Sequence, residues 1–317
     1  MKHHDPLSAP CFLVGAERSG TTMLRLMLDS HPQLAWCSEF EFIVDHLTEP
    51  GAWVDLQNYY KILDTDRIFQ HYNLRIDHQL SYPDLVADFM RQKQVRDRKE
   101  QVGATVHRHF DRLLWIWPKA RFIHLVRDPR DVAPSCISMG WAGNVWTGVE
   151  RWREAEELWT TLKSKLTSDR YLEVRYELLL QDPEKALTEM CQFLGLSYSA
   201  QMLSYPNYTT YDAPDARYAQ KWKQTMKKKD VQLVEAKVAH LLVERGYQLS
   251  GHEIPTPSSL QKKALQVQDR LARIQARIKS MGLSLFVADY IVRRLGVEPW
   301  QRAMRLRLNE VEQAALK

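Results

Sequence analysis

Residues 10–30 read PCFLVGAERSGTTMLRLMLDS, and the architecture of the whole chain can be inferred outward from them. Pro10–Val14 is a short apolar run that ends in Gly15, which predicts a buried strand. The residues AERSG that follow favour a turn, and from Thr21 onward apolar side chains recur at the spacing of an amphipathic helix, which stops before Pro32. The order is therefore strand, tight loop and helix.

The loop has the glycine spacing of a phosphate-binding loop but lacks its lysine. Gly15 and Gly20 are spaced as in the Walker A pattern G-x-x-x-x-G-K-[ST], while Thr21 stands where the lysine would be. Such a loop surrounds anionic oxygens with backbone N–H groups at a helix N-terminus. We expect it to hold a shorter anion than a triphosphate, with Arg18 as the cation. A chance strand–turn–helix with two glycines is the alternative.

A second anion site is predicted after the apolar run Arg121–Val126. The turn RDPRD begins with Arg127, and Ser135 follows eight residues later on the next helix. Ligands of open α/β sheets bind at such strand ends, and arginine and serine can both donate to a phosphate. A salt-bridged turn, in which Arg127 pairs with Asp128 or Asp131, is the alternative. One ligand with two separated phosphates would suit both sites.

The remaining pattern alternates helices and strands. A mixed helical region is expected over residues 41–98, a helix over 149–165, and a strand over 171–174 that runs into 176–180. A further helix over 183–194 ends at Gly195. This alternation predicts an α/β fold, a three-layer α/β/α sandwich around a central parallel sheet.

The 317 residues have an ordinary globular composition, with 44% apolar and 26% charged residues. We divide them into a main domain, residues 1–250, and a basic helical extension, residues 251–317. From Thr256 onward there are twelve Lys and Arg against five Asp and Glu, so the net charge of +5 originates in the extension. That excess fits an anionic ligand but does not indicate nucleic acid. The extension is expected to be a packing lid, a homodimer contact or a docking face for an anionic membrane.

The four cysteines, Cys11, Cys37, Cys136 and Cys191, are widely spaced and form no CxxC pair, so we expect buried, reduced thiols. No histidine cluster has metal-ligand spacing, and no metal is expected. No stretch is apolar enough to span a membrane, and the opening MKHHDPLSAP does not resemble a signal peptide. A cytoplasmic location is therefore predicted.

These motifs resemble the sulfotransferase superfamily. FLVGAERSGTTMLRLMLDSHP is similar to the 5′-phosphosulfate loop of tyrosylprotein sulfotransferases and their bacterial relatives, and ARFIHLVRDPRDVAPS resembles the 3′-phosphate motif. YLEVRYELLLQDPEKAL and AQKW resemble two later donor-binding segments. The resemblance runs from about residue 10 to residue 247, and the extension lies outside it.

The resemblance implies a P-loop NTPase-like fold and a sulfonate donor, 3′-phosphoadenosine-5′-phosphosulfate, whose sulfonate passes to a hydroxyl-bearing acceptor without a metal. By that resemblance the donor would be held by Arg18, Ser19, Gly20, Thr21, Thr22, Arg127, Ser135, Tyr176 and Lys221. Arg18 would also stabilise charge during transfer. A P-loop nucleotide kinase or NTPase, disfavoured by Thr21 and by the lack of an identifiable Walker B aspartate, and a non-catalytic nucleotide-binding protein are the alternatives.

Two residues compete for the role of general base. Glu39 falls at the position of the catalytic glutamate of the related tyrosylprotein enzymes, and partial burial would raise its pKa. His107 is its rival because cytosolic sulfotransferases use a histidine from a similar segment, and His109 is a further candidate. We expect Glu41 to face away from Glu39 if this segment is extended.

Three further expectations concern the surroundings of the acceptor. A lysine that many relatives carry is replaced where Ala104 and Thr105 stand, so Arg108 becomes the candidate second cation. An acceptor-side loop is expected at Trp141, Gly143 and Asn144, whereas Trp152 and Trp159 are assigned to the core.

Overall fold

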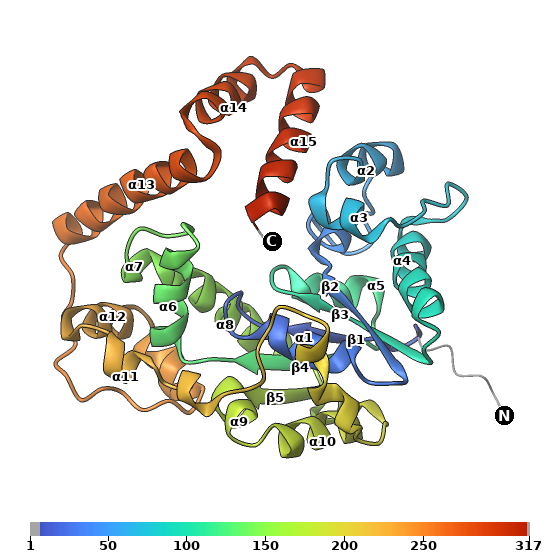
Figure 1. Cartoon of the computed structure of the whole chain (residues 1–317), viewed down its shortest axis with the longest axis horizontal. Helices are drawn as coiled ribbons and strands as arrows, with labels where there is room; N and C mark the ends of the chain where they lie inside the picture. Colours follow the sequence, from blue (N-terminus) through green and yellow to red (C-terminus); the bar gives the residue numbers. More distant parts are fainter. Residues whose placement is uncertain (1–6, 316–317) are drawn as a thin grey trace.

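The computed structural model describes residues 7–315, with side chains to residue 313, and contains a five-stranded parallel sheet (Figure 1). The polar opening at residues 1–6 lies outside the described residues. The strand order is β2-β3-β1-β4-β5, so β1 lies at the centre. The strands are β1 (Cys11–Val14), β2 (Leu34–Glu39), β3 (Gln101–Val106), β4 (Arg121–Val126) and β5 (Tyr171–Arg175).

Helices connect these strands and follow them to the end of the chain. The α-helices are α1 (Thr21–Asp29), α2 (Leu56–Leu63), α3 (Arg67–Tyr72), α4 (Tyr82–Asp97), α5 (Leu113–Ile116), α6 (Pro129–Ser138), α7 (Val145–Gly148), α8 (Glu150–Lys163), α9 (Tyr176–Gln181), α10 (Pro183–Leu194), α11 (Trp222–Thr225), α12 (Lys228–Glu244), α13 (Ser259–Met281), α14 (Leu283–Leu295) and α15 (Glu298–Ala315). Short 3₁₀ helices are η1 (Glu41–Ile43), η2 (Phe110–Arg112), η3 (Ser168–Arg170), η4 (Ala200–Leu203), η5 (Tyr205–Asn207) and η6 (Ala216–Tyr218).

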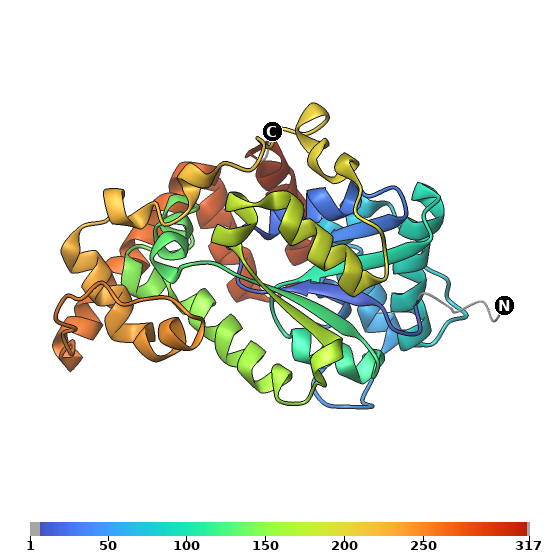
Figure 2. The same cartoon turned by 90° about the horizontal axis from the view of Figure 1, so that it is seen from below.

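Alternate side chains of the sheet enter two different cores, because successive residues of a strand point to opposite faces. On β1, Phe12 and Val14 pack with side chains of α2, α3, α4, α5 and α8 on one face. Cys11 and Leu13 pack with α1, α9 and α10 on the other. Figures 1 and 2 show the sheet between these two helical layers. The expected three-layer α/β/α fold is confirmed.

A third core lies around α6, α7, α8 and α12, on the side of the sheet where β4 ends. Trp152 of α8 is fully buried there, and Trp159 is fully buried in the core that contains Phe12. Both tryptophans are core residues, as the sequence predicted. All four cysteines are buried free thiols, also as expected.

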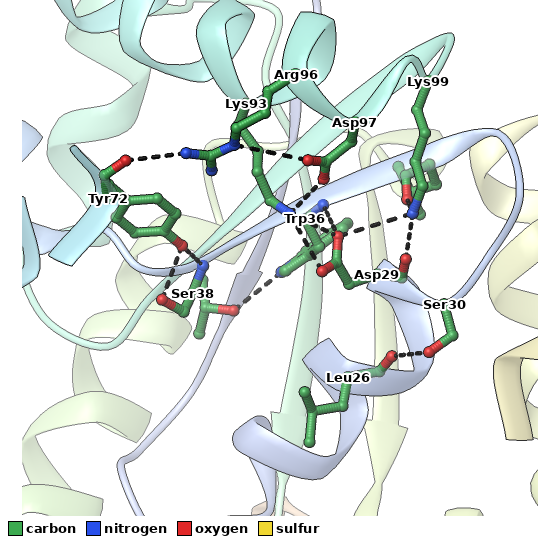
Figure 3. Close-up of polar contacts among 12 residues, drawn as sticks. Leu26, Asp29, Ser30, Trp36, Ser38, Tyr72, Lys93, Arg96, Asp97 and Lys99 are labelled. Carbon is green, nitrogen blue, oxygen red and sulfur yellow. Dashed lines mark hydrogen bonds and ion pairs between the residues drawn. The ribbon is translucent and has the colours of Figure 1, made fainter. Parts of the chain in front are cut away.

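A polar network fixes the end of α1 against β2 and α4 (Figure 3). Asp29 at the end of α1 accepts from the Trp36 backbone N–H of β2 at 2.7 Å and from Lys93 Nζ of α4 at 3.1 Å. At the other end of β2, Ser38 Oγ lies 2.7 Å from the hydroxyl of Tyr72. The network therefore sets where β2 ends, which is where Glu39 lies.

The extension crosses the molecule as an arch of α13, α14 and α15 that returns beside α3 (Figure 1). Asp269 of α13 is buried and accepts from the Gly143 N–H and from Thr147 Oγ1, both at 2.7 Å. Arg302 of α15 pairs with Asp64, which follows α2, at 2.6 Å. Both ends of the arch are thus fixed to the main domain. Within residues 7–315 no helix is long and apolar enough to cross a membrane.

Candidate active site

The loop between β1 and α1 has a backbone that only glycine fits well at its two ends. Gly15 has φ +140°, and a Cβ there would lie 2.3 Å from the Leu125 carbonyl oxygen of β4. Gly20 has φ +94°, and its Cβ would lie 2.3 Å from the ring of Tyr176. Arg18 also has a positive φ, 68°. The loop is therefore folded tightly against β4 and α9, and its N–H groups lie at the start of α1.

The two sequence motifs meet through Arg18. Its Nε donates to Ser135 Oγ of α6 at 2.9 Å, and its carbonyl oxygen accepts from Arg127 Nη1 at 3.2 Å. The Arg127 guanidinium lies over the Tyr176 ring, 4.4 Å from its centre. Four residues expected to hold one ligand, from four different elements of the chain, are thus in direct contact.

Unsatisfied donors remain in this cluster. Ser19 is fully buried and its hydroxyl has no hydrogen-bond partner within residues 7–315, and the same is true of Arg127 Nε. Buried polar groups without partners are uncommon and usually await a ligand or water. A cavity of about 280 Å³ opens beside them and is lined by Arg18, Gly20, Thr21, Thr22, Met23, Arg127, Tyr176, Leu180, Tyr211, Asp212, Ala213, Asp215 and Tyr218.

Lys221 lies apart from the other expected donor residues. It is exposed, and its Nζ lies 5.7 Å from the centre of the Tyr218 ring, which lines the cavity. Ser135 does not line the cavity itself and acts on it through Arg18. The structure thus brings Arg18, Ser19, Gly20, Thr21, Thr22, Arg127, Ser135 and Tyr176 together and leaves Lys221 at the mouth.

Arg130, rather than Arg127, forms the ion pairs that hold the turn after β4. Asp128 receives two hydrogen bonds from the Arg130 guanidinium, at 2.8 and 2.7 Å, and Arg130 also pairs with Glu235 of α12 at 2.7 Å. In the described part of the chain Arg127 pairs with no carboxylate, so the alternative of a salt-bridged Arg127 turn is wrong. Burial raises the pKa of Asp131 to about 6, although the charge of Arg127 lowers it.

A buried pair connects the loop to the second candidate region. His107, after β3, donates from Nδ1 to Glu41 Oε1 at 2.7 Å, and its Nε2 lies 2.9 Å from Thr21 Oγ1. Burial lowers the pKa of His107, but the hydrogen bond and charge of Glu41 raise it more. Burial likewise raises the pKa of Glu41, but His107 lowers it more. The pairing with Glu41 therefore favours the protonated form of His107 and engages its Nδ1, while Nε2 shares a hydrogen bond with the Thr21 hydroxyl.

Glu39 and Glu41 line the same cavity, of about 350 Å³, and the extended segment on which their facing apart depended is not present at Glu41. The chain leaves the strand after Glu39 and enters η1 at Glu41, which ends the two-residue alternation. The Glu39 side chain is 47% exposed, more open than the sequence suggested, and lies 3.9 Å from the Arg67 guanidinium.

The remaining acceptor-side candidates have other contacts. Arg108 lines the cavity of Glu39, but its guanidinium is paired with Asp45 at 2.6 Å. His109 adopts a positive φ of 54° and does not line that cavity. Gly143 and Asn144 bind α13, with Asn144 Nδ2 donating to the Leu265 carbonyl at 2.8 Å. Trp141 is 37% exposed, and its ring lies 6.0 Å from the Arg18 guanidinium.

Sequence reasoning missed three contributors to this region. Glu41 was not considered as a site residue because an extended strand was assumed there, whereas β2 ends at Glu39. Arg67 had no motif around it, and Arg305 of α15 lies in the extension, far along the chain from the other cavity residues. Only the amphipathic pattern of the extension indicated that it packs on something.

The fold and the site together define a class: an α/β phosphate-binding protein with a P-loop-like turn, two arginines from separate strand ends, and a second cavity holding a carboxylate. Among residues 7–315 no cluster of three or more His, Cys, Asp or Glu could hold a metal ion.

Comparisons with known proteins agree with this class. The model of the sulfotransferase family matches residues 10–200. Protein-tyrosine sulfotransferase 2 of Gallus gallus is 28% identical over 208 residues, which cover 61% of this chain and 53% of the relative. The omega-hydroxy-beta-dihydromenaquinone-9 sulfotransferase of Mycobacterium bovis is 35% identical over 101 residues, 26% of this chain and 25% of the relative.

Among solved structures, the sulfotransferase domain of the Synechococcus PCC 7002 olefin synthase superposes with a TM-score of 0.54. It is 22% identical and covers 76% of this chain and 95% of that domain, a likeness of fold. The chain belongs to the sulfotransferase family. It spans about half the length of its chicken relative.

Proposed function

We propose that the protein transfers a sulfonate group from 3′-phosphoadenosine-5′-phosphosulfate to a hydroxyl group of an acceptor. The observation that carries this proposal is the contact of Arg18 with both Ser135 and Arg127 beside a cavity lined by Arg127, whose Nε has no hydrogen-bond partner within residues 7–315. A donor that carries phosphates at two positions needs two anion sites along one edge of the sheet. Family membership supports the same activity.

The residues of the first cavity fit such a donor. Within residues 7–315 Ser19 Oγ and Arg127 Nε have no hydrogen-bond partner, and hydrogen bonds from these groups to phosphate oxygens would satisfy them. Ser19, Gly20, Thr21 and Thr22 would bind the 5′-phosphosulfate, Arg127 and Ser135 the 3′-phosphate, and Tyr176 the adenosine. Lys221 would approach from the mouth.

We assign the proton transfer to Glu39. The acceptor's O–H proton would pass to this carboxylate as its oxygen bonds to sulfur, while the bond from sulfur to the donor's phosphate oxygen breaks. Arg18 would stabilise the charge on the oxygens of the leaving phosphate. Both ring nitrogens of His107 are already engaged, Nδ1 by Glu41 and Nε2 by Thr21, so we assign His107 to orienting Thr21.

The charges that the transfer requires come from Arg18 and Arg127, so the proposal includes no metal ion. A nucleotide kinase is less suited to this site, because Thr21 stands where a lysine would reach the terminal phosphates of a triphosphate. Transfer of sulfonate needs no such lysine.

Replacing Glu39 tests the proposed activity directly. Glu39→Gln keeps the size of the side chain but removes its basicity, so we expect kcat to fall by about 10²–10⁴-fold. Binding of 3′-phosphoadenosine-5′-phosphate, measured by calorimetry, should be unchanged. Glu49→Gln, at an exposed position, is the control. Equal turnover by wild type and Glu39→Gln would remove Glu39 from the mechanism, and no turnover in either would indicate a non-catalytic nucleotide-binding protein.

The partner of the extension and the location of the protein belong to this proposal. Exposed apolar side chains on α14 recur at helical spacing at Leu283, Val287, Ile291 and Leu295, beside the exposed cations Arg293 and Arg294. This surface suits an anionic membrane, and a homodimer contact is the alternative. Four buried free thiols are compatible with a cytoplasmic location.

A further inference from the structure

The last helix of the chain forms one wall of the cavity that contains Glu39. This cavity, of about 350 Å³, is lined on one side by residues of β2, η1 and α3 and on the other by Arg305, Leu308, Asn309 and Glu312 of α15. In Figure 1, α15 runs from the top of the arch down toward the ends of β2 and β3, beside α3. The family model matches residues 10–200, so α15 lies outside the matched segment.

Specific contacts hold α15 in this position. Arg302 pairs with Asp64 at 2.6 Å, and Asn309 Nδ2 donates to the Thr65 carbonyl at 3.0 Å. Arg67, the neighbour of Glu39, also lies 3.3 Å from Glu312. All three contacts are made to the turn between α2 and α3 or to the first residue of α3. These three contacts fix the position of α15 at the mouth of the cavity.

The cavity is lined almost entirely by hydrogen-bonding side chains. Nine of its eleven residues are polar or charged, and the two apolar ones are Ile68 and Leu308. Three guanidinium groups stand against four carboxylates, so neither sign of charge dominates. No aromatic ring lines the cavity. A bound group would therefore meet many donors and acceptors but little apolar surface.

Arg305 is the free donor of this wall. Its side chain is exposed, and within residues 7–315 it makes neither a hydrogen bond nor an ion pair, whereas Arg67 and Arg108 are both paired. A guanidinium offers five donors in a fixed plane. Beside it, Asn309 has an amide oxygen that remains able to accept.

We propose that α15 completes the acceptor site and that the acceptor presents a neutral, polyhydroxylated group the size of one sugar ring. The inference rests on the proposed function, since Glu39 must act on this acceptor. Hydroxyl groups both donate and accept, which matches the mixed lining. The volume is near the lower end of ligand cavities and admits one such ring. A phenol offers a single hydroxyl group and an apolar ring, and therefore matches this lining less well than a sugar ring.

Amide hydrogen exchange of α15 tests this inference without relying on turnover. The probe is methyl β-D-glucopyranoside, added in the presence of 3′-phosphoadenosine-5′-phosphate, with N-acetyl-L-tyrosinamide as the phenolic comparison. We expect the sugar to slow exchange in α15 and at residues 64–68, and the phenol to have no effect. Arg305→Ala should raise the Kd for the sugar about tenfold, the loss of one charged hydrogen bond. Arg307→Ala, another exposed arginine of α15, should leave the Kd unchanged.

A charge exchange tests the docking of the helix. Arg302→Glu should speed exchange in α15 and weaken sugar binding, and adding Asp64→Arg should restore both. Calorimetry with 3′-phosphoadenosine-5′-phosphate separates the two proposals, because its binding should be unchanged in every variant. No protection of α15 by the sugar, equal effects of Arg305→Ala and Arg307→Ala, or protection by the phenol instead would overturn the inference. Failure of the bisphosphate to bind would instead contradict the proposed function.

Discussion

At the residue scale, the site depends on which cations are already paired. The chain surrounds Arg127 with acidic neighbours in sequence, yet Asp128 is satisfied by Arg130 and by the indole N–H of Trp222 at 2.9 Å. Arg127 is therefore held by a carbonyl and an aromatic ring, which position a guanidinium without neutralising it. A phosphate arriving there meets a full positive charge.

Asp131 is an acid near Arg127 whose pKa is raised. Its Oδ1 accepts from the backbone N–H of Trp222 at 2.7 Å, but Oδ2 is buried and has no hydrogen-bond partner in the described part of the chain, and burial raises the pKa of this carboxyl to about 6. The unfolded chain ionises first, near pH 4, so this carboxyl lowers the stability of the folded state as pH rises from 4 to 6.

Asp131→Asn should remove this pH dependence. Relative to wild type, the unfolding free energy of the variant should rise by roughly 2–3 kcal/mol between pH 4 and pH 7, because a displacement of two pKa units corresponds to that energy. Urea unfolding across this range measures it, with the exposed Glu154→Gln as control. A stability difference that stays constant with pH would show that Asp131 is ionised normally.

The side chains that meet beside the first cavity were largely predictable from the sequence, whereas those that line the cavity of Glu39 were not. Arg18 and Arg127 lie in short motifs at strand ends, where the spacing along the chain is enough to predict which side chains come into contact. Glu41 depends on where β2 stops, and Arg305 on how a helix more than 250 residues away docks. Neither has a local signal.

At the element scale, the turn between β1 and α1 is the part with the least freedom. Its glycines are constrained by different neighbours: Gly15 by the backbone of β4 and Gly20 by the Tyr176 ring of α9. The conformation of the loop is therefore fixed by its packing against both the sheet and α9. The strand–turn–helix predicted from the sequence therefore takes the shape of an anion-binding loop only when it packs against β4 and α9.

Gly20→Ala should damage the loop more than its φ value alone would require. The new methyl group would overlap the Tyr176 ring, and we expect a loss of about 2–4 kcal/mol in stability and of bisphosphate binding. Gly195→Ala is the matched control: it has a similar positive φ of 76° but nothing within 4 Å, so only about 1 kcal/mol should be lost. Chemical unfolding and calorimetry measure both. Equal losses of stability in the two variants would show that the Tyr176 ring can move aside without cost.

The elements recognised from sequence were the strongly patterned ones. Strands β1, β4 and β5 and helices α1, α8 and α10 lie within one or two residues of the predicted ranges. Strand β3 was missed because QVGATV has little apolar bulk, and Gly103 is required there by the Trp36 ring, whose atoms a Cβ would approach to 2.3 Å. Strand β2 was missed because only its start is apolar.

At the scale of the whole molecule, the extension is joined to the site at two places. Asp269 holds α13 on the segment after α6, while Arg302 and Asn309 hold α15 near Glu39. The family model matches residues 10–200, and the division predicted from the sequence lies further along the chain, at residue 250. We expect this division to mark a boundary in stability, because much of the arch is exposed.

Asp269→Ala should loosen the extension without changing donor binding. Two buried hydrogen bonds of 2.7 Å would be lost, so we expect about 1–3 kcal/mol less protection in α13 by hydrogen exchange. Removing only its exposed partner, by Arg273→Ala, should have little effect. Unchanged exchange in α13 after Asp269→Ala would mean that other contacts hold the arch.

Calorimetric titration with 3′-phosphoadenosine-5′-phosphate, without metal and alongside ATP with magnesium, tests the central claim most directly. We expect micromolar binding of the bisphosphate, much weaker binding of ATP, and at least a tenfold loss of affinity in Arg127→Ala, because that variant removes the guanidinium that we assign to the 3′-phosphate. Preference for ATP with magnesium, or equal affinity in wild type and Arg127→Ala, would contradict the assignment of this cavity to the sulfonate donor.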